Sequence, residues 1–326
     1  MTRDAQIAAF LARHGATLAD TEPLAQDASF RRYLRVRRPI RAVLMDAPPP
    51  EDVRPFLQIA RHLYAQGLTV PEILDADPDI GLVLEADFGD ALLSTLLDAG
   101  EPAEPLLNRA VDALVQWQRA EPPPGVPAWD HVPMTATALG TLFDWWWPAR
   151  YGAPAPAGAR ADVEAGLTEM LRPVAEGPRC GVHRDWFAGN LLSLPDGGVG
   201  IIDFQTAAIG HPAYDLMSLL QDARRDIPER AAASAFARYL AARPDLDPEA
   251  FKAAYQACAA QRHLRVAGQW VRLALRDHRP QYLAYGPRTW RLLRDALAQP
   301  AAAPLAAALD RWIPAADRGN PPGLAT

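Results

Sequence analysis

Four polar residues near the middle of the chain have types and spacings that suit one kind of chemistry. His183 and Asp185 lie in VHRDWFAGN, Asn190 follows Asp185 by five positions, and Asp203 comes thirteen positions after that in IIDFQ. Transfer of a phosphoryl group needs a carboxylate that orients or deprotonates the attacking hydroxyl, and oxygen ligands for Mg²⁺. Asp185 suits the first task, and Asn190 and Asp203 suit the second. The apolar stretches LLSL and VGIID, joined by PDGG, predict a short hairpin between Asn190 and Asp203.

The elements that must position these residues fall into two groups. Residues 16–46 are β-rich, 56–68 have a helical apolar stripe, and 70–90 contain two short apolar runs joined by the turn ADPD. After a helix predicted over 90–100, the pattern is mostly helical apart from the hairpin. We therefore expect an α+β fold with two lobes. A small β-rich N-lobe would span residues 1–88, and a larger, mainly helical C-lobe would span 89–326.

The motifs resemble those of a known family. HRDxxxxN followed by a hairpin and IIDFQ resembles the protein-kinase-like fold, and DFQTAAIGHPAYDL (203–216) is similar to the DFxxxxxGxPxxDL pattern of the aminoglycoside phosphotransferase and choline kinase family. The resemblance implies ATP and Mg²⁺ as cofactors, with Asp185 as the catalytic base and Asn190 and Asp203 as metal ligands. It also implies that His183 and Asp215 brace the catalytic loop.

A narrower resemblance concerns the acceptor. It rests on four stretches: DASFRRYLRV (27–36), VLMDAPPPED (43–52), HRDWFAGNLL (183–192) and QRHLRVAGQWVRLALRDHRPQYL (261–283). They resemble the bacterial anomeric kinases of N-acetylmuramate and N-acetylglucosamine. That family phosphorylates the C1 hydroxyl of its sugar and feeds UDP-amino-sugar synthesis during cell-wall recycling. Two alternatives stay open: a kinase of the same fold for an aminoglycoside, choline or another sugar, and a non-catalytic nucleotide-binding protein.

A DFG tripeptide occurs in LEADFGD (84–90), but its place in the chain is wrong for a metal ligand. The metal-binding aspartate must follow the catalytic loop, and Asp87 precedes Asp185 by almost a hundred residues. The segment follows an apolar strand and precedes a helix, where the linker between kinase lobes belongs. By resemblance, the Glu85 carbonyl would accept from the adenine amino group and the Asp87 N–H would donate to the ring.

The cations available to hold a phosphate are almost all arginines. Of the 33 basic residues only Lys252 is a lysine, and it is not in a GxxxxGK[ST] loop. The lysine expected on the third kinase strand would fall near Met45. With a four-residue loop over 37–40, Arg32 would lie opposite Met45, so we predict that Arg32 reaches the phosphates. Ser29 would form part of the turn over the phosphates in place of a glycine-rich loop.

The acceptor site is expected to suit a neutral or anionic molecule. Residues 251–300 contain nine basic and two acidic side chains, whereas a polycationic acceptor would need carboxylates. One helical stripe of this segment would hold Arg262 and three further arginines, of which Arg262 is the candidate for a substrate contact. The alternative is that most of these arginines lie on a solvent-exposed face of the helix, as is common for such a stripe. Trp186 follows the base directly and is the aromatic candidate for lining the acceptor site.

Composition restricts the class of protein, its location in the cell and its partners. The net charge of −6 and 49% apolar residues are ordinary for a globular protein, and no basic tract suggests nucleic acid. The N-terminus lacks a continuous apolar signal region, and no apolar run approaches the roughly 20 residues of a membrane span. Cys180 and Cys258 are expected to be free thiols. We expect a cytoplasmic protein whose partners are ATP and a small sugar, with no nucleic-acid, membrane or obligate protein partner.

Overall fold

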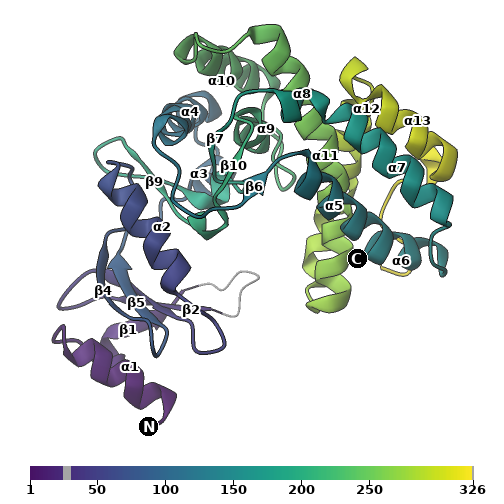
Figure 1. Ribbon diagram of the computed structural model, residues 1–326. Coiled ribbons are helices and arrows are strands. Elements are labelled where there is room, and N and C mark those ends of the chain that lie inside the picture. Colours follow the sequence, from purple (N-terminus) through teal and green to yellow (C-terminus); the bar gives the residue numbers. More distant parts are fainter. Residues whose placement is uncertain (25–30, 325–326) are drawn as a thin grey trace. The chain divides into compact units, whose positions relative to one another are not determined.

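The computed structural model describes residues 1–24 and 31–324 and divides into two compact units. Unit 1 comprises Met1–Gly100 together with Gly189–Thr206, and unit 2 comprises Glu101–Ala188 together with Ala207–Thr326. Unit 1 contains the larger sheet, whereas unit 2 is mostly helical (Figure 1). The predicted α+β class is confirmed.

The sheet of unit 1 has five antiparallel strands in the order β1-β2-β3-β5-β4. The strands are β1 (Thr21–Pro23), β2 (Arg32–Val36), β3 (Ala42–Asp46), β4 (Ile73–Asp77) and β5 (Leu82–Ala86). Helices α1 (Arg3–Ala12) and α2 (Arg54–Ala65) lie on opposite sides of this sheet, and α3 (Leu93–Asp98) follows β5 (Figure 1). The hairpin of β8 (Leu191–Ser193) and β9 (Val199–Ile201) also belongs to this unit.

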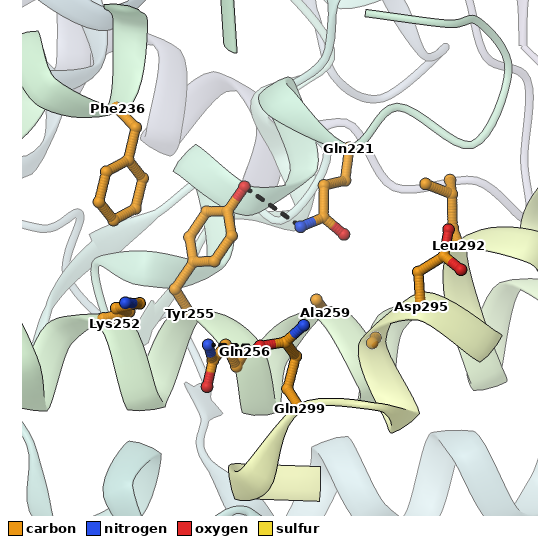
Figure 2. Close-up of a pocket in the computed structure, with 10 residues that line it drawn as sticks. Gln221, Phe236, Lys252, Tyr255, Gln256, Ala259, Leu292, Asp295 and Gln299 are labelled. Atoms are coloured by element: carbon orange, nitrogen blue, oxygen red, sulfur yellow. Dashed lines mark hydrogen bonds between the residues drawn. The ribbon is translucent and has the colours of Figure 1, made fainter. Parts of the chain in front are cut away.

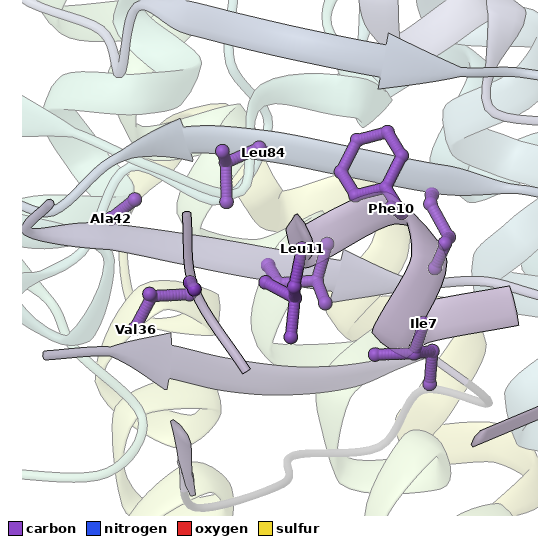
Figure 3. Packing of buried hydrophobic residues seen from close by; sticks show 9 residues of the cluster. Ile7, Phe10, Leu11, Val36, Ala42 and Leu84 are labelled. Carbon is purple, nitrogen blue, oxygen red and sulfur yellow. The ribbon is translucent and has the colours of Figure 1, made fainter. Parts of the chain in front are cut away.

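One face of the sheet is closed by α1. Figure 3 shows Ile7, Phe10 and Leu11 of the helix directed at alternate strand residues, among them Val36 and Leu84. Alternation along a strand sends every second side chain to each face, so the strand residues of this apolar cluster all lie on the α1 face. The side chains available for nucleotide chemistry must therefore come from the other face.

The register of β2 against β3 decides which arginine faces which side. Arg32 lies opposite Asp46, and Tyr33 lies opposite Met45. The predicted pairing of Arg32 with Met45 is therefore wrong by one residue. The loop between the strands runs over residues 37–41, one residue longer than expected. A shift of one residue moves every side chain to the other face, and it places Arg32 on the α1 side.

Unit 2 is built around its longest helix. Helix α11 (Pro248–Arg276) has 29 residues and contacts α5 (His131–Thr141), α9 (Ala213–Leu220) and α12 (Gly286–Leu297). Gly268 permits the close approach to α5, because a Cβ there would lie 2.4 Å from the Thr141 carbonyl oxygen. Despite the length of α11, no helix among residues 1–24 and 31–324 is long and apolar enough to cross a membrane.

The remaining helices and a small sheet complete unit 2. The sheet has the order β6-β10-β7 and leads into the catalytic loop through β7. Its strands are β6 (Ala128–Trp129), β7 (Cys180–Val182) and β10 (Ala208–Gly210). The other helices are α4 (Ala103–Arg119), α6 (Trp147–Tyr151), α7 (Ala157–Met170), α8 (Arg172–Glu176), α10 (Glu229–Ala242) and α13 (Ala303–Trp312).

Candidate active site

The two candidate metal ligands meet at the open end of the β8–β9 hairpin in unit 1. The Ile202 N–H donates to the Asn190 carbonyl at 3.1 Å, which continues the ladder beyond β9. The Asn190 side-chain amide lies 3.4 Å from Asp203 Oδ2, and Gln205 Nε2 donates to Asp203 Oδ1 at 2.6 Å. The structure therefore brings an amide oxygen donor and a carboxylate to one place. Oxygen donors of this kind are the ligands that Mg²⁺ prefers.

Asp203 has an uncommon backbone conformation. Its φ is 62°, in the left-handed region that residues other than glycine rarely adopt. The next residue, Phe204, is buried and stacks on Phe56 of α2 with ring centroids 5.2 Å apart. This anchor fixes the turn from which the Asp203 carboxylate projects. Strained backbone concentrates at functional sites, which favours a functional role for this carboxylate.

The Asp87 carboxylate has a different task, since it binds groups of its own segment and a neighbouring strand. It accepts from the Gly89 N–H at 2.8 Å and lies 3.0 Å from Arg35 Nε. Arg35 also donates to Asp90 at 2.7 Å and to the Gly89 carbonyl at 3.1 Å. The carboxylate is thus committed to holding the turn after β5.

The same segment holds the hairpin that carries Asn190 and Asp203. A Cβ on Gly200 of β9 would lie 2.6 Å from the Phe88 ring, so this glycine lets Phe88 pack directly on the strand. The Ser193 N–H donates to the Ala91 carbonyl at 2.8 Å. Residues 87–92 therefore support the candidate metal site structurally.

The backbone of Glu85 is used within the sheet. The Ala47 N–H donates to the Gly81 carbonyl at 2.9 Å, and hydrogen-bonded pairs alternate along an antiparallel ladder. In the observed register this alternation makes Val43 and Glu85 a hydrogen-bonded pair. The prediction that the Glu85 carbonyl accepts from adenine is therefore wrong, because that carbonyl points toward β3. The next backbone group, that of Ala86, points the other way and donates to Glu72 at 2.9 Å.

A polar cluster occupies the face of the sheet away from α1. Tyr33 and Glu85 lie on this face, and Arg31 hydrogen-bonds Tyr33 and forms an ion pair with Glu51 at 3.5 Å. Burial raises the pKa of Glu85 to about 8, although the Arg31 charge opposes the shift. Burial also raises the pKa of Tyr33 to about 12, and the charges of Glu85 and Asp203 act in the same direction. Tyr33, which Arg31 contacts, is therefore within electrostatic range of the candidate metal ligand Asp203.

Arg32, one of the two predicted phosphate contacts, does not belong to this cluster. Arg32 donates from Nε to the buried Asp46 carboxylate at 2.8 Å, and Arg3 donates to the same carboxylate at 2.9 Å. Arg32 therefore links β2 to β3 and, through the shared Asp46 carboxylate and Arg3, to α1. Ser29 lies outside the described residues. Strand alternation backward from Tyr33 would have identified Arg31 if the loop length had been known.

The catalytic loop lies in unit 2, and a buried aspartate organises it. Asp215 accepts from the His183 N–H at 2.7 Å and from the Arg184 N–H at 2.9 Å. Burial raises the pKa of Asp215, although His183 and both backbone donors oppose the shift. Arg184 has φ 75°, and its guanidinium carbon lies 3.8 Å from the centre of the Trp129 ring. These contacts fix the backbone just before Asp185.

Arg262 of α11 reaches the predicted catalytic base. Its guanidinium lies 3.5 Å from Asp185 Oδ1 and donates to the Arg184 carbonyl at 2.9 Å and to the Tyr214 hydroxyl at 3.2 Å. Only 7% of the Arg262 side chain is exposed, against 36% for Asp185. Burial alone would raise the pKa of Asp185, but Arg262, Arg265 and His183 lower it. Asp185 is therefore held as a carboxylate.

Trp186 is not at an accessible site. Its side chain is fully buried and packs edge-on against Trp117, with ring centroids 5.8 Å apart, and against His183 at 5.7 Å. The prediction that it lines the acceptor site is wrong in this structure, because these partners enclose the indole.

A pocket of about 390 Å³ lies elsewhere in unit 2, among α10, α11 and α12, where Lys252 and Tyr255 contribute to its lining (Figure 2). It is separate from the catalytic loop residues.

Comparison with known proteins defines the class. Residues 20–251 match the Phosphotransferase enzyme family, and the chain belongs to that family. It is 36% identical to the N-acetylmuramate/N-acetylglucosamine kinase of Caulobacter vibrioides over 97% of this chain and 98% of that protein. Four curated relatives, 32–36% identical, have this name.

Solved structures agree on the fold. A choline/ethanolamine kinase family protein from Mesorhizobium loti is 17% identical, with a TM-score of 0.67 over 94% of this chain and 98% of that one. An ADP-bound aminoglycoside phosphotransferase is 15% identical, with a TM-score of 0.62 over 90% of this chain and 98% of that one. The protein-kinase-like fold expected from the motifs is confirmed.

Proposed function

We propose that this chain transfers the γ-phosphoryl group of ATP to the anomeric C1 hydroxyl of N-acetylmuramate, N-acetylglucosamine or both. The observation that carries the chemistry is the pairing of the Asn190 side chain with the Asp203 carboxylate at the hairpin end. The shared name of the curated relatives supports the choice of acceptor. A role in cell-wall recycling and a cytoplasmic location belong to the same proposal.

The proposed mechanism assigns one task to each polar residue. The acceptor oxygen attacks the γ-phosphorus, the bond to the β,γ-bridging oxygen breaks, ADP leaves, and Asp185 takes the hydroxyl proton. Asn190 and Asp203 would hold Mg²⁺, which when bound neutralises charge on the phosphate oxygens. His183 and Asp215 fix the loop, and Arg262 positions Asp185.

The nucleotide is proposed to bind along the β5 end of unit 1. Because the Glu85 carbonyl points toward β3, the Ala86 carbonyl and the Phe88 N–H take the adenine contacts first expected at Glu85 and Asp87. We still propose that residues 1–88 bind the nucleotide and that residues 89–326 bind the acceptor. The hairpin with Asn190 and Asp203 is the exception, because it clusters with unit 1.

A coupled assay of ADP release tests the proposed function. We expect Mg·ATP-dependent turnover with N-acetylmuramate, N-acetylglucosamine or both, and none above background with kanamycin or choline. The sugar product should lose its reducing end, because a phosphate on C1 blocks ring opening. Turnover with cationic acceptors alone would refute the sugar assignment, and ATP binding without turnover on any acceptor would favour a non-catalytic protein.

We also propose that Arg31 takes the place of the missing lysine. It lies on the face of the sheet that bears Tyr33 and Glu85, whereas Arg32 is on the α1 face. Arg31→Gln should raise the KM for ATP by about tenfold to a hundredfold, the loss expected for one charge-assisted hydrogen bond. Arg32→Gln is the matched control and should lower the melting temperature while leaving the KM for ATP within about twofold. The reverse pattern would restore the assignment to Arg32.

A further inference from the structure

Four arginines follow one side of α11 and begin at the catalytic loop. Arg262, Arg265, Arg272 and Arg276 are separated by three, seven and four residues. Such separations repeat with the helical turn, so these side chains form one arginine stripe. Because Arg262 contacts Asp185, the stripe starts beside the predicted base.

The two ends of the arginine stripe already have partners. Arg262 contacts Asp185, the Arg184 carbonyl and Tyr214. At the other end, the exposed Arg276 donates to Asp277 at 2.8 Å. Neither end is therefore the natural place for another anion.

The middle of the arginine stripe differs from its ends. Arg265 and Arg272 are half-buried, and the buried Nε of each has no hydrogen-bond partner among the described residues. Like charges lie near both residues, since the Arg265 charge acts on Arg184 and Arg272, and Arg276 also acts on Arg272. Asp185 near Arg265 and Asp277 near Arg272 offset part of this repulsion. Buried donors without partners are costly, and neighbouring like charges add to the cost. A bound carboxylate would relieve both, because a guanidinium binds its two oxygens in one plane.

We propose that Arg265, assisted by Arg272, binds the carboxylate of N-acetylmuramate and so sets the preference between the two sugars. This inference rests on the proposed function. The two sugars share the C1 hydroxyl and the acetamido group, but only N-acetylmuramate has a lactyl ether with a carboxylate. A carboxylate site would act on one acceptor and not on the other, whereas contacts to ATP or to Asp185 would affect both equally.

The test compares both sugars in one variant. Both sugars are compared at a pH where Asp185 is ionised with or without the Arg265 charge. In Arg265→Gln, kcat/KM for N-acetylmuramate should then fall by about tenfold to a hundredfold, through KM, while the value for N-acetylglucosamine stays within about twofold. Arg265→Lys, which keeps the charge, should recover part of the loss. Arg276→Gln is the matched control on the same stripe and should leave both sugars unchanged.

The outcomes are separable. Equal loss on both sugars in Arg265→Gln would overturn the inference and assign Arg265 to the phosphates or to Asp185. No change on either sugar would also overturn it. If Arg265→Gln does not fold, Arg272→Gln provides the same comparison with the same expected selectivity. A wild-type protein that phosphorylates neither sugar would instead overturn the proposed function, and this inference with it.

Discussion

Replacing Asp203 with asparagine is expected to abolish turnover, whereas the same change at Asp87 should leave it nearly intact. Both aspartates begin a DF dipeptide, yet their surroundings differ. Asp203 projects from a strained turn beside Asn190, where its carboxylate would bind Mg²⁺. An amide in its place loses the negative charge that a divalent cation requires. We expect kcat to fall by about a thousandfold or more, and steady-state kinetics with varied Mg²⁺ will measure it.

Asp87→Asn is a well-matched control because it makes the same chemical change in the same unit. An asparagine oxygen can still accept from the Gly89 N–H, but the ion pair with Arg35 is lost. The expected result is a lower free energy of unfolding, by about 1–3 kcal/mol, with kcat within about twofold. Thermal or denaturant unfolding measures the first quantity. An inactive Asp87→Asn enzyme that is folded would contradict the assignment of the two motifs.

The parts of the site that sequence could predict are those fixed by local spacing. The apolar runs LLSL and VGIID around the PDGG turn predicted a hairpin between Asn190 and Asp203, and the structure places both residues at its open end. Chain order alone separated Asp87 from Asp203. The fold class followed from the same short motifs and from the apolar periodicity of the segments around them, which separated a β-rich part from a helical part.

The parts that sequence missed depend on loop length and on distant partners. One extra residue in the loop after Val36 exchanged the faces of Arg31 and Arg32, because side chains alternate along a strand. Glu85 was misassigned for a related reason, since the direction of its carbonyl depends on pairing with β3. Trp186 is enclosed by Trp117, about 70 positions earlier in the chain, and no local pattern indicates that contact.

The second large effect is expected at the predicted base. Asp185→Asn should lower kcat by about a hundredfold to ten-thousandfold, the usual contribution of a positioned general base. The change preserves shape, and the His183 and Arg184 N–H groups can still donate to the Asp215 carboxylate. The KM for ATP should therefore change little. Single-turnover measurements with a saturating sugar will separate the chemical step from binding, and a variant with normal kcat would remove Asp185 from the mechanism.

The pH dependence of the rate gives an independent check on the same carboxylate. Arg262 helps to hold the pKa of Asp185 below its ordinary value, so the group stays ionised as the pH falls toward that lowered pKa. Removing the positive charge in Arg262→Gln should raise the pKa of Asp185. The acidic limb of kcat/KM should consequently move to higher pH than in the wild type, with the same sugar and nucleotide. A loss of rate at every pH without movement of this limb would instead mean that Arg262 only supports the fold.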